Sequence, residues 1–222
     1  MDYAALKVAV QDYTENTFSD VDFATMTQLA EQKIYNSVQL PIMRKTATLP
    51  LTAFTNTLNA PADFLNAFSL SIYNPVGSGG YIYLVNKDVN FIYEAYPQPN
   101  QSGTPKYYAI NGPQAVDQLL TAFILGPAPE TVFAEDGYAL LTYSYYPESI
   151  VTAGTTWLST NFNSVLFNGV MVEAIRFMKG EQDMVDLYAE QYKQSMTLFK
   201  NLVDGKLRQD AYRNGQLRTQ VI

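Results

Sequence analysis

The chain lacks the two residue types on which most enzyme sites depend. None of its 222 residues is cysteine or histidine. Without cysteine there are no disulfides and no thiolate chemistry. Without histidine the commonest general base and the commonest metal ligand are missing. Zinc sites, serine triads of the usual kind and metal-dependent hydrolases are therefore not expected.

Long apolar runs are missing as well. No run approaches the roughly 20 residues that a membrane-spanning helix needs. The N-terminal residues 1–4 lack the basic and apolar regions of a signal peptide. We therefore expect no membrane partner and folding in the cytoplasm. Hydrophobic residues make up 47% of the chain, enough for a real core in one large domain or two small ones.

Charge is scarce and unevenly spread. Charged residues are 16% of the chain and the net charge is −7. Residues 206–222 carry Lys206, Arg208, Arg213 and Arg218 against Asp210, a net charge of +3, so the remaining chain carries −10. An acidic body is not a general nucleic-acid binder, because phosphate contacts need cations. The basic tail is either a solvated chain end or a docking arm for an acidic partner surface.

Residues 1–40 have the pattern of two helices. Residues 3–14 contain good helix formers and neither glycine nor proline. A second helix is predicted to start after Ser19 or Asp20, whose side chains can cap the first turn. Its apolar residues recur at three- and four-residue spacing, which predicts one buried face made of Phe23, Met26, Ala30 and Ile34.

Residues 41–150 change to short apolar runs separated by proline and glycine, which predicts a β-rich domain. A short helix is expected at 89–96. The strand candidates are 46–52, 70–73, 81–85, 107–110, 119–125 and 138–146.

Residues 151–204 return to helical periodicity. One buried helix is predicted over 156–179 and a second from Glu181 to about Asp204. The first of these helices is expected to bury Trp157, Phe162, Leu166 and Phe177 against the apolar face of the N-terminal helices, at Phe23, Met26 and Ile34. Residues 205–222 have little periodicity and are predicted to be an extended basic arm.

These patterns predict an α+β fold. Neither terminal helix pair can bury its apolar face alone, so the N- and C-terminal helices should form one helical bundle. The β-rich domain 41–150 would then be inserted in that bundle, and the C-terminal arm would follow it.

Several local patterns partly match known chemical sites, and none favours catalysis. The loop Gly77–Gly80 lacks the lysine of a P-loop and is typical of a hairpin turn. The pair Asp20 and Asp22 lacks the remaining ligands of a calcium loop. Adjacent Glu135 and Asp136 in a tight turn are poorly placed to act on one glycosidic bond. Trp157 is interpreted as a core anchor, with a ligand-stacking platform as the alternative. We predict no catalytic, cofactor-binding or metal-binding residue and no enzyme.

The order of several short segments resembles the head-to-tail adaptor (connector) proteins of tailed bacteriophages, especially the tail tubular protein A type of short-tailed phages. The resemblance covers most of the chain, and each segment is weak by itself. The segments are residues 29–30, 49–51, 60–64, 88–92, 127–129, 141–147, Trp157 and 173–179.

The resemblance implies a structural virion protein at the head–tail junction, made in the host cytoplasm. Twelve copies would form a ring that joins the portal protein to the tail nozzle or another tail protein. Double-stranded DNA would pass through the ring during genome ejection without specific binding. In such proteins the C-terminal arm commonly reaches toward the portal, and the residues inferred here for that contact are Lys206, Leu207, Arg208, Tyr212, Arg213, Leu217, Arg218 and Ile222.

Two alternatives remain open at this point. One is a neck protein of a long-tailed phage, although such connectors are usually smaller. The other belongs to a different class, a tail component that binds or hydrolyses glycans through exposed tyrosines or Glu135.

Overall fold

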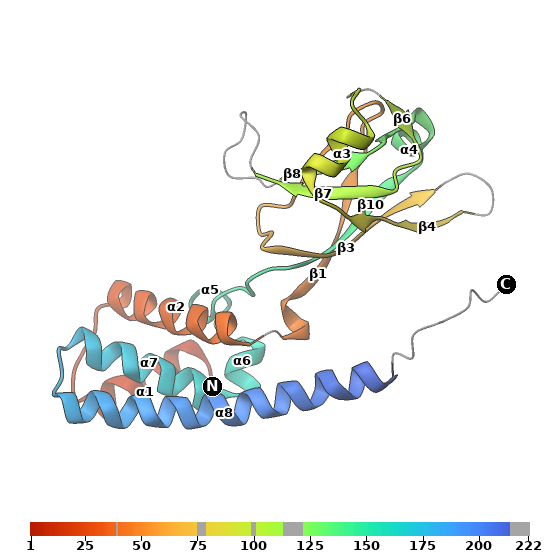
Figure 1. Ribbon diagram of the computed structural model, residues 1–222. Helices are drawn as coiled ribbons and strands as arrows, with labels where there is room; N and C mark the ends of the chain where they lie inside the picture. The colour runs from red at the N-terminus through yellow and green to blue at the C-terminus, as the bar shows by residue number, and fades with distance from the viewer. Residues whose placement is uncertain (39, 75–78, 99–100, 113–121, 214–222) are drawn as a thin grey trace. The chain divides into compact units, whose positions relative to one another are not determined.

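The computed structural model describes the chain except residues 39, 75–78, 99–100, 113–121 and 214–222. The chain divides into two units (Figure 1). One combines Met1–Pro41 with Pro147–Ile222, and the other is Ile42–Tyr146. The first unit is helical and the second contains the β-sheets, which confirms the mixed α+β class.

Both predicted N-terminal helices are present, and a side chain caps the start of each. Helix α1 spans Tyr3–Thr14, and the Asp2 carboxylate accepts from the Ala5 N–H at 2.7 Å. Helix α2 spans Asp20–Ser37, and the Ser19 hydroxyl accepts from the Asp22 N–H at 3.2 Å. The predicted face of α2 is confirmed, because all four of its apolar residues are buried.

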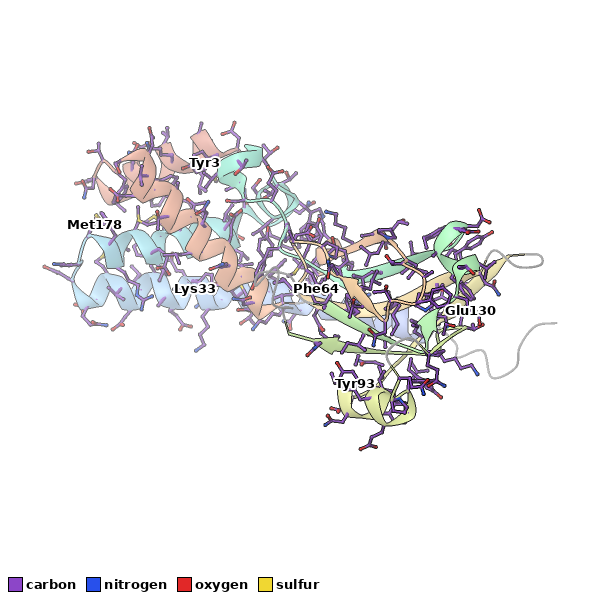
Figure 2. All side chains as sticks on the ribbon, turned by 90° about the horizontal axis from the view of Figure 1, so that it is seen from above. Tyr3, Lys33, Phe64, Tyr93, Glu130 and Met178 are labelled. Carbon is purple, nitrogen blue, oxygen red and sulfur yellow. The ribbon has the colours of Figure 1, made fainter. Side chains whose placement is uncertain are left out.

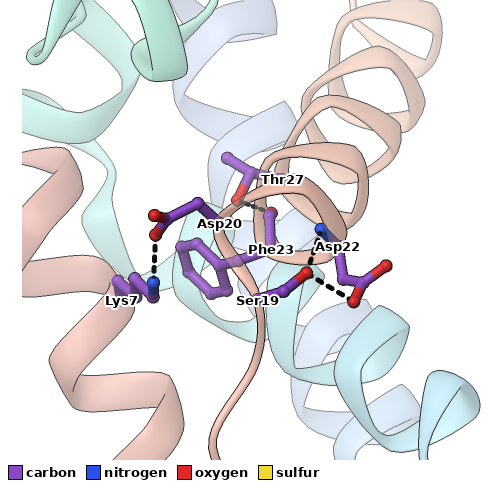
Figure 3. A network of polar contacts seen from close by, with 6 residues as sticks. All are labelled: Lys7, Ser19, Asp20, Asp22, Phe23 and Thr27. Atoms are coloured by element: carbon purple, nitrogen blue, oxygen red, sulfur yellow. Dashed lines mark hydrogen bonds and ion pairs between the residues drawn. The ribbon is translucent and has the colours of Figure 1, made fainter.

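Polar contacts at the start of α2 hold it beside α1 (Figure 3). Lys7 of α1 forms an ion pair with Asp20, which lowers the pKa of that exposed carboxyl. The Thr27 hydroxyl donates to the Phe23 carbonyl at 2.8 Å, so this fully buried polar group is satisfied within the helix. The two helices therefore present their apolar sides to a common core.

The C-terminal half of the helical unit contains four helices, α5 (Ile150–Ala153), α6 (Trp157–Asn161), α7 (Asn163–Phe177) and α8 (Gln182–Arg213). The prediction of one helix over 156–179 is wrong. Phe162 leaves the helical region with φ −139° and ψ 50°, and a capping box between Thr156 and Ser159 starts α6 as a separate turn. Apolar spacing missed this break because it continues across Phe162.

Helix α7 is the centre of the helical unit and packs against α1, α2 and α8. Leu166 is fully buried there, and Phe162 lies 4.6 Å, centroid to centroid, from the ring of Phe199 on α8. Trp157 and Phe162 are half-buried. The predicted burial of Phe177 is wrong: its side chain is 53% exposed at the last turn of α7, where its ring meets the Phe18 ring edge-on at 6.0 Å, centroid to centroid.

Two four-stranded sheets form the β unit. The first has the order β1 (Arg44–Pro50), β10 (Tyr138–Ser144), β3 (Asn66–Asn74) and β4 (Gly80–Tyr83), all antiparallel. The second has the order β2 (Thr57–Asn59), β8 (Ala122–Gly126), β7 (Tyr107–Asn111) and β5 (Val85–Asn86). Each strand candidate from the sequence overlaps one of these strands, although residues 119–121 lie outside the described residues.

Apolar side chains from both sheets share one core. It includes Leu70, Ile72 and Leu141 from the first sheet and Phe123 and Leu125 from the second. Phe64 packs edge-on against Phe123 at 5.4 Å, and Figure 2 shows its place in this unit. All the described residues of this core lie within 42–146.

Short elements complete the β unit. Helix α3 (Val89–Ala95) is the predicted short helix, capped by Asp88. The sequence did not predict the 3-10 turn η1 (Pro41–Met43), helix α4 (Thr131–Glu135) or the two-stranded pair of β6 (Ser102–Gly103) and β9 (Ala128–Pro129). These elements have two to five residues, too few for a periodicity to show.

Candidate interaction surfaces

The first part of the basic C-terminal segment is helical. Helix α8 continues through Gly205 to Arg213. The predicted extended arm is therefore wrong for residues 205–213, which include Lys206, Leu207, Arg208, Tyr212 and Arg213. A single glycine costs a helix only about 1 kcal/mol relative to alanine, and the neighbouring Lys, Leu, Arg, Gln and Ala are good helix formers. Leu217, Arg218 and Ile222 lie outside the described residues.

A buried carboxylate holds the segment in which the chain re-enters the helical unit. Glu31 of α2 is 3% exposed. Its oxygens accept from the Ser149 hydroxyl at 2.5 Å and from the Ile150 N–H at 3.0 Å, at the start of α5. Burial raises the pKa of Glu31, and these two hydrogen bonds oppose that rise. Sequence reasoning missed Glu31, although its spacing from Thr27 and Ile34 places it on the buried side of α2.

One segment of the adaptor-like pattern has a structural role. Asp63, from the motif at 60–64, accepts from the Tyr143 hydroxyl at 2.7 Å and from the Lys45 ammonium at 2.9 Å. Burial alone would raise the pKa of Asp63, but the two hydrogen bonds outweigh it and hold that pKa below its usual range. The contacts fasten the loop before β3 to β1 and β10, so this motif stabilises the β unit.

Tyrosines gather on the outer face of the first sheet. The rings of Tyr73 and Tyr138 stack at 5.2 Å with an interplanar angle of 13°. The hydroxyl oxygens of Tyr81 and Tyr138 lie 2.8 Å apart. Tyr138 thus stacks its face on Tyr73 and shares a hydrogen bond with Tyr81, so these rings are a poor platform for stacking a sugar ring. Tyr83, 70% exposed, is the more open member of this face.

A hollow of about 350 Å³ lies between α2 and α7. Apolar side chains of Met26, Leu29 and Phe177 line it together with charged Glu173 and Arg176. Glu173 also forms an ion pair with Lys33. Arg176 pairs with Glu173 within α7, and the Lys33–Glu173 pair joins α2 to α7, so this hollow is interpreted as part of the α2–α7 contact.

The chemical patterns from the sequence occupy structural positions. The strands on either side of the Gly77–Gly80 loop, β3 and β4, pair as a hairpin, and residues 75–78 themselves lie outside the described residues. Asp20 and Asp22 belong to the first turn of α2, and Glu135 ends α4. Within the described part of the chain, no group of three or more Asp or Glu side chains is arranged to hold a metal ion.

In the part of the chain that the structure describes, the polar groups named above hold elements together within each unit. The match to known families gives the class of the protein. The chain belongs to the SU10 adaptor protein family, whose model matches residues 1–220. This makes it a phage head–tail adaptor, a structural protein of the virion neck that binds portal and tail proteins.

Two further findings accompany the family match. No curated protein matches the chain in a sequence comparison. Among the described helices, none has the length and apolar character needed to cross a bilayer.

Proposed function

We propose that this adaptor forms a ring of twelve copies between the portal protein and the next tail component, and that the genome leaves through its lumen. The observation that carries the proposal is the family match over residues 1–220. A protein that joins two symmetric assemblies must itself repeat around their axis, and a heterologous contact that closes produces such a ring.

The charge of the chain suits a DNA channel. The net charge is −7, and the residues before 206 carry −10. Carboxylates along a lumen repel phosphates, so DNA slides without adhering. A basic lumen would instead bind DNA in a salt-dependent manner.

The basic C-terminal segment is proposed to dock on the portal. Its arginines, Arg208, Arg213 and Arg218, can pair with portal carboxylates in two-point geometry. Because residues 205–213 continue α8, this arm begins as a helix. One arm binds weakly, and twelve arms on one ring bind strongly through effective concentration.

The ring is tested by imaging virions and by symmetry measurement at the neck. Twelve-fold symmetry in the layer below the portal is expected, and a trimeric or hexameric layer would contradict the proposal. The arm is tested separately by deleting residues 206–222. The truncated protein should keep its thermal transition, with a small loss of helical circular dichroism because residues 206–213 belong to α8, but should fail to join DNA-filled heads. Retention of wild-type attachment would show that the segment is only a solvated tail.

A further inference from the structure

Three asparagines of the chain precede glycine, the order that most favours loss of the side-chain amide as ammonia. The pairs are Asn111–Gly112, Asn168–Gly169 and Asn214–Gly215, and the last lies outside the described residues. The reaction begins when the main-chain nitrogen of the following residue attacks the asparagine Cγ. Glycine favours this attack because it has no side chain to block the approach and its backbone bends readily into the ring that forms. The sequence alone does not distinguish Asn111 from Asn168.

The structure holds Asn111 in the orientation that the reaction needs. Its side-chain oxygen Oδ1 accepts from the Gly112 N–H at 3.0 Å. Since Oδ1 is bonded to Cγ, the attacking nitrogen lies beside the carbon that it attacks. Asn111 is the last residue of β7 and is half-buried, and Gly112 is exposed, so water and hydroxide reach both groups. A Cβ atom at Gly112 would meet nothing within 4 Å, so the space around this nitrogen is open.

Two other asparagines each lack one of these conditions. Asn168–Gly169 lies within α7, where Gly169 is buried and helical N–H groups donate to carbonyls of the preceding turn. The Asn168 side-chain NH₂ donates to the Ser195 Oγ at 3.5 Å. Asn16 has the contact, because its Oδ1 accepts from the Thr17 N–H at 2.8 Å, but the β-branched threonine crowds the nitrogen. Asn111 combines the following glycine with the side-chain contact.

We propose that Asn111 is a site of spontaneous modification, at which the Gly112 nitrogen drives deamidation through a succinimide. The nitrogen loses its proton to hydroxide and bonds to Asn111 Cγ. The Cγ–Nδ2 bond breaks, and Nδ2 takes a proton from water and leaves as ammonia. Water then opens the succinimide ring. Opening at Cγ gives aspartate, and opening at the main-chain carbonyl carbon gives isoaspartate, so the net reaction consumes water and releases ammonia.

Both products place a carboxylate where the chain had an amide, at the end of a strand that pairs with β8. Asn111 lies opposite Ala122 in that pairing. Isoaspartate also adds a carbon to the main chain, so the last pair of the β7–β8 ladder loses its register. The modification should therefore accumulate as the protein ages and loosen this end of the second sheet. It lies in the β unit and does not depend on the proposed ring.

Ageing of the purified full-length protein tests the site. The protein is incubated at mildly alkaline pH, digested, and mapped by mass spectrometry, and isoaspartate is detected by labelling with an isoaspartyl methyltransferase. The Asn111 peptide should convert before any change is seen at Asn16 or Asn168. Its conversion should accelerate as pH rises, because base removes the Gly112 proton. Reaction of Asn16 or Asn168 ahead of Asn111 would overturn the inference.

The same incubation in urea separates the effect of the fold from that of the sequence. In the unfolded chain Asn111 and Asn168 should react at comparable rates, since both precede glycine and their native contacts are gone. Folding should protect Asn168 and leave Asn111 reactive. If the folded protein keeps the Asn111 amide over the time in which the unfolded chain loses it, the fold protects this site and the inference is overturned.

Gly112→Ala is the matched variant. The site has space for a Cβ atom, and its φ lies outside the left-handed region, so alanine fits without strain. The variant should keep the thermal transition and retain the Asn111 amide. Hydroxylamine under native conditions cleaves a succinimide, so aged wild type should give fragments 1–111 and 112–222 and the variant should not. The aspartate form of aged wild type should co-elute with Asn111→Asp on anion exchange. Equal deamidation of wild type and Gly112→Ala would refute attack by the Gly112 nitrogen.

Discussion

At the scale of single residues, Glu31 is the most consequential polar group in the helical unit. It is buried, it belongs to α2, and it accepts two hydrogen bonds from the segment that starts α5. Glu31→Ala should lower the free energy of unfolding by about 1–3 kcal/mol, because two donors lose their acceptor. Glu31→Gln should cost much less, since its amide oxygen can accept from Ile150 and its NH₂ can donate to Ser149. Urea unfolding of both variants at neutral pH checks this, and equal losses would contradict it.

The same residue predicts a pH dependence. Burial raises the pKa of Glu31 in the folded chain, so the folded state binds its proton more tightly than the unfolded state. The contribution of Glu31 to unfolding free energy therefore falls as pH rises from about 4.3, the ordinary glutamate value, through the raised folded pKa. The difference in unfolding free energy between wild type and Glu31→Gln, measured across this range, should move in favour of Gln with rising pH. A constant difference would show that Glu31 does not titrate differently on folding.

Burial, not residue type, decides the cost of core substitutions in α7. Leu166 has no exposed surface, whereas Phe177 is 53% exposed. Leu166→Ala should lower the free energy of unfolding by about 2–5 kcal/mol. Phe177→Ala should cost clearly less than the value expected for a buried phenylalanine, because water already reaches half of the ring. Chemical denaturation of the two variants in parallel should preserve this order; a larger loss for Phe177→Ala would contradict it.

At the scale of elements, Gly169 sets how closely α7 approaches α2 and α8. A Cβ atom at Gly169 would lie 3.3 Å from the Tyr192 ring and 3.5 Å from the Ala30 Cβ. Gly169→Leu should therefore destabilise the unit by about 1–3 kcal/mol through overpacking. Gly169→Ala combines a better helix propensity, worth up to about 1 kcal/mol, with a tight but not impossible contact. Thermal unfolding should rank Leu well below both Ala and wild type, with exposed Gln32→Leu on α2 as a neutral control.

At the scale of the whole molecule, the β unit enters and leaves the helical unit through two adjacent chain segments. The Tyr145 N–H donates to the Met43 carbonyl at 2.9 Å, so the two ends of residues 42–146 lie side by side. Among the residues that the structure describes, its core contains none from outside this range. We predict that residues 42–146 fold alone and that a short Gly-Ser linker can replace them in the helical unit. Cooperative unfolding of both pieces by circular dichroism is expected, and a piece without a cooperative transition would contradict this.

Local patterns in the sequence determined where most elements lie. A run of helix formers without glycine or proline located α1, and capping residues with three-to-four spacing located α2, because helix ends and faces depend on residues close in the chain. Strands β1, β3, β7 and β10 followed from short apolar runs between turns. The class of protein, a phage head-to-tail adaptor, was also accessible from the order of weak segments such as 60–64, whereas the tail tubular protein A type is not confirmed by the family match.

Only the tertiary structure decided features that depend on contacts between distant residues. Both Phe177 and Glu31 lie at helical spacing from buried residues of their own helices, yet Phe177 is exposed and Glu31 is buried. The difference depends on which neighbouring elements cover that part of α7 and of α2. The break at Phe162 separates α6 from α7 although the apolar spacing continues across it. The continuation of α8 through Gly205, in contrast, agrees with local propensity, because one glycine costs a helix only about 1 kcal/mol. A hollow lined by Tyr13 of α1 and Phe167 of α7 exists because these two helices meet. They are more than 140 residues apart in the chain, so no local sequence pattern could predict this contact.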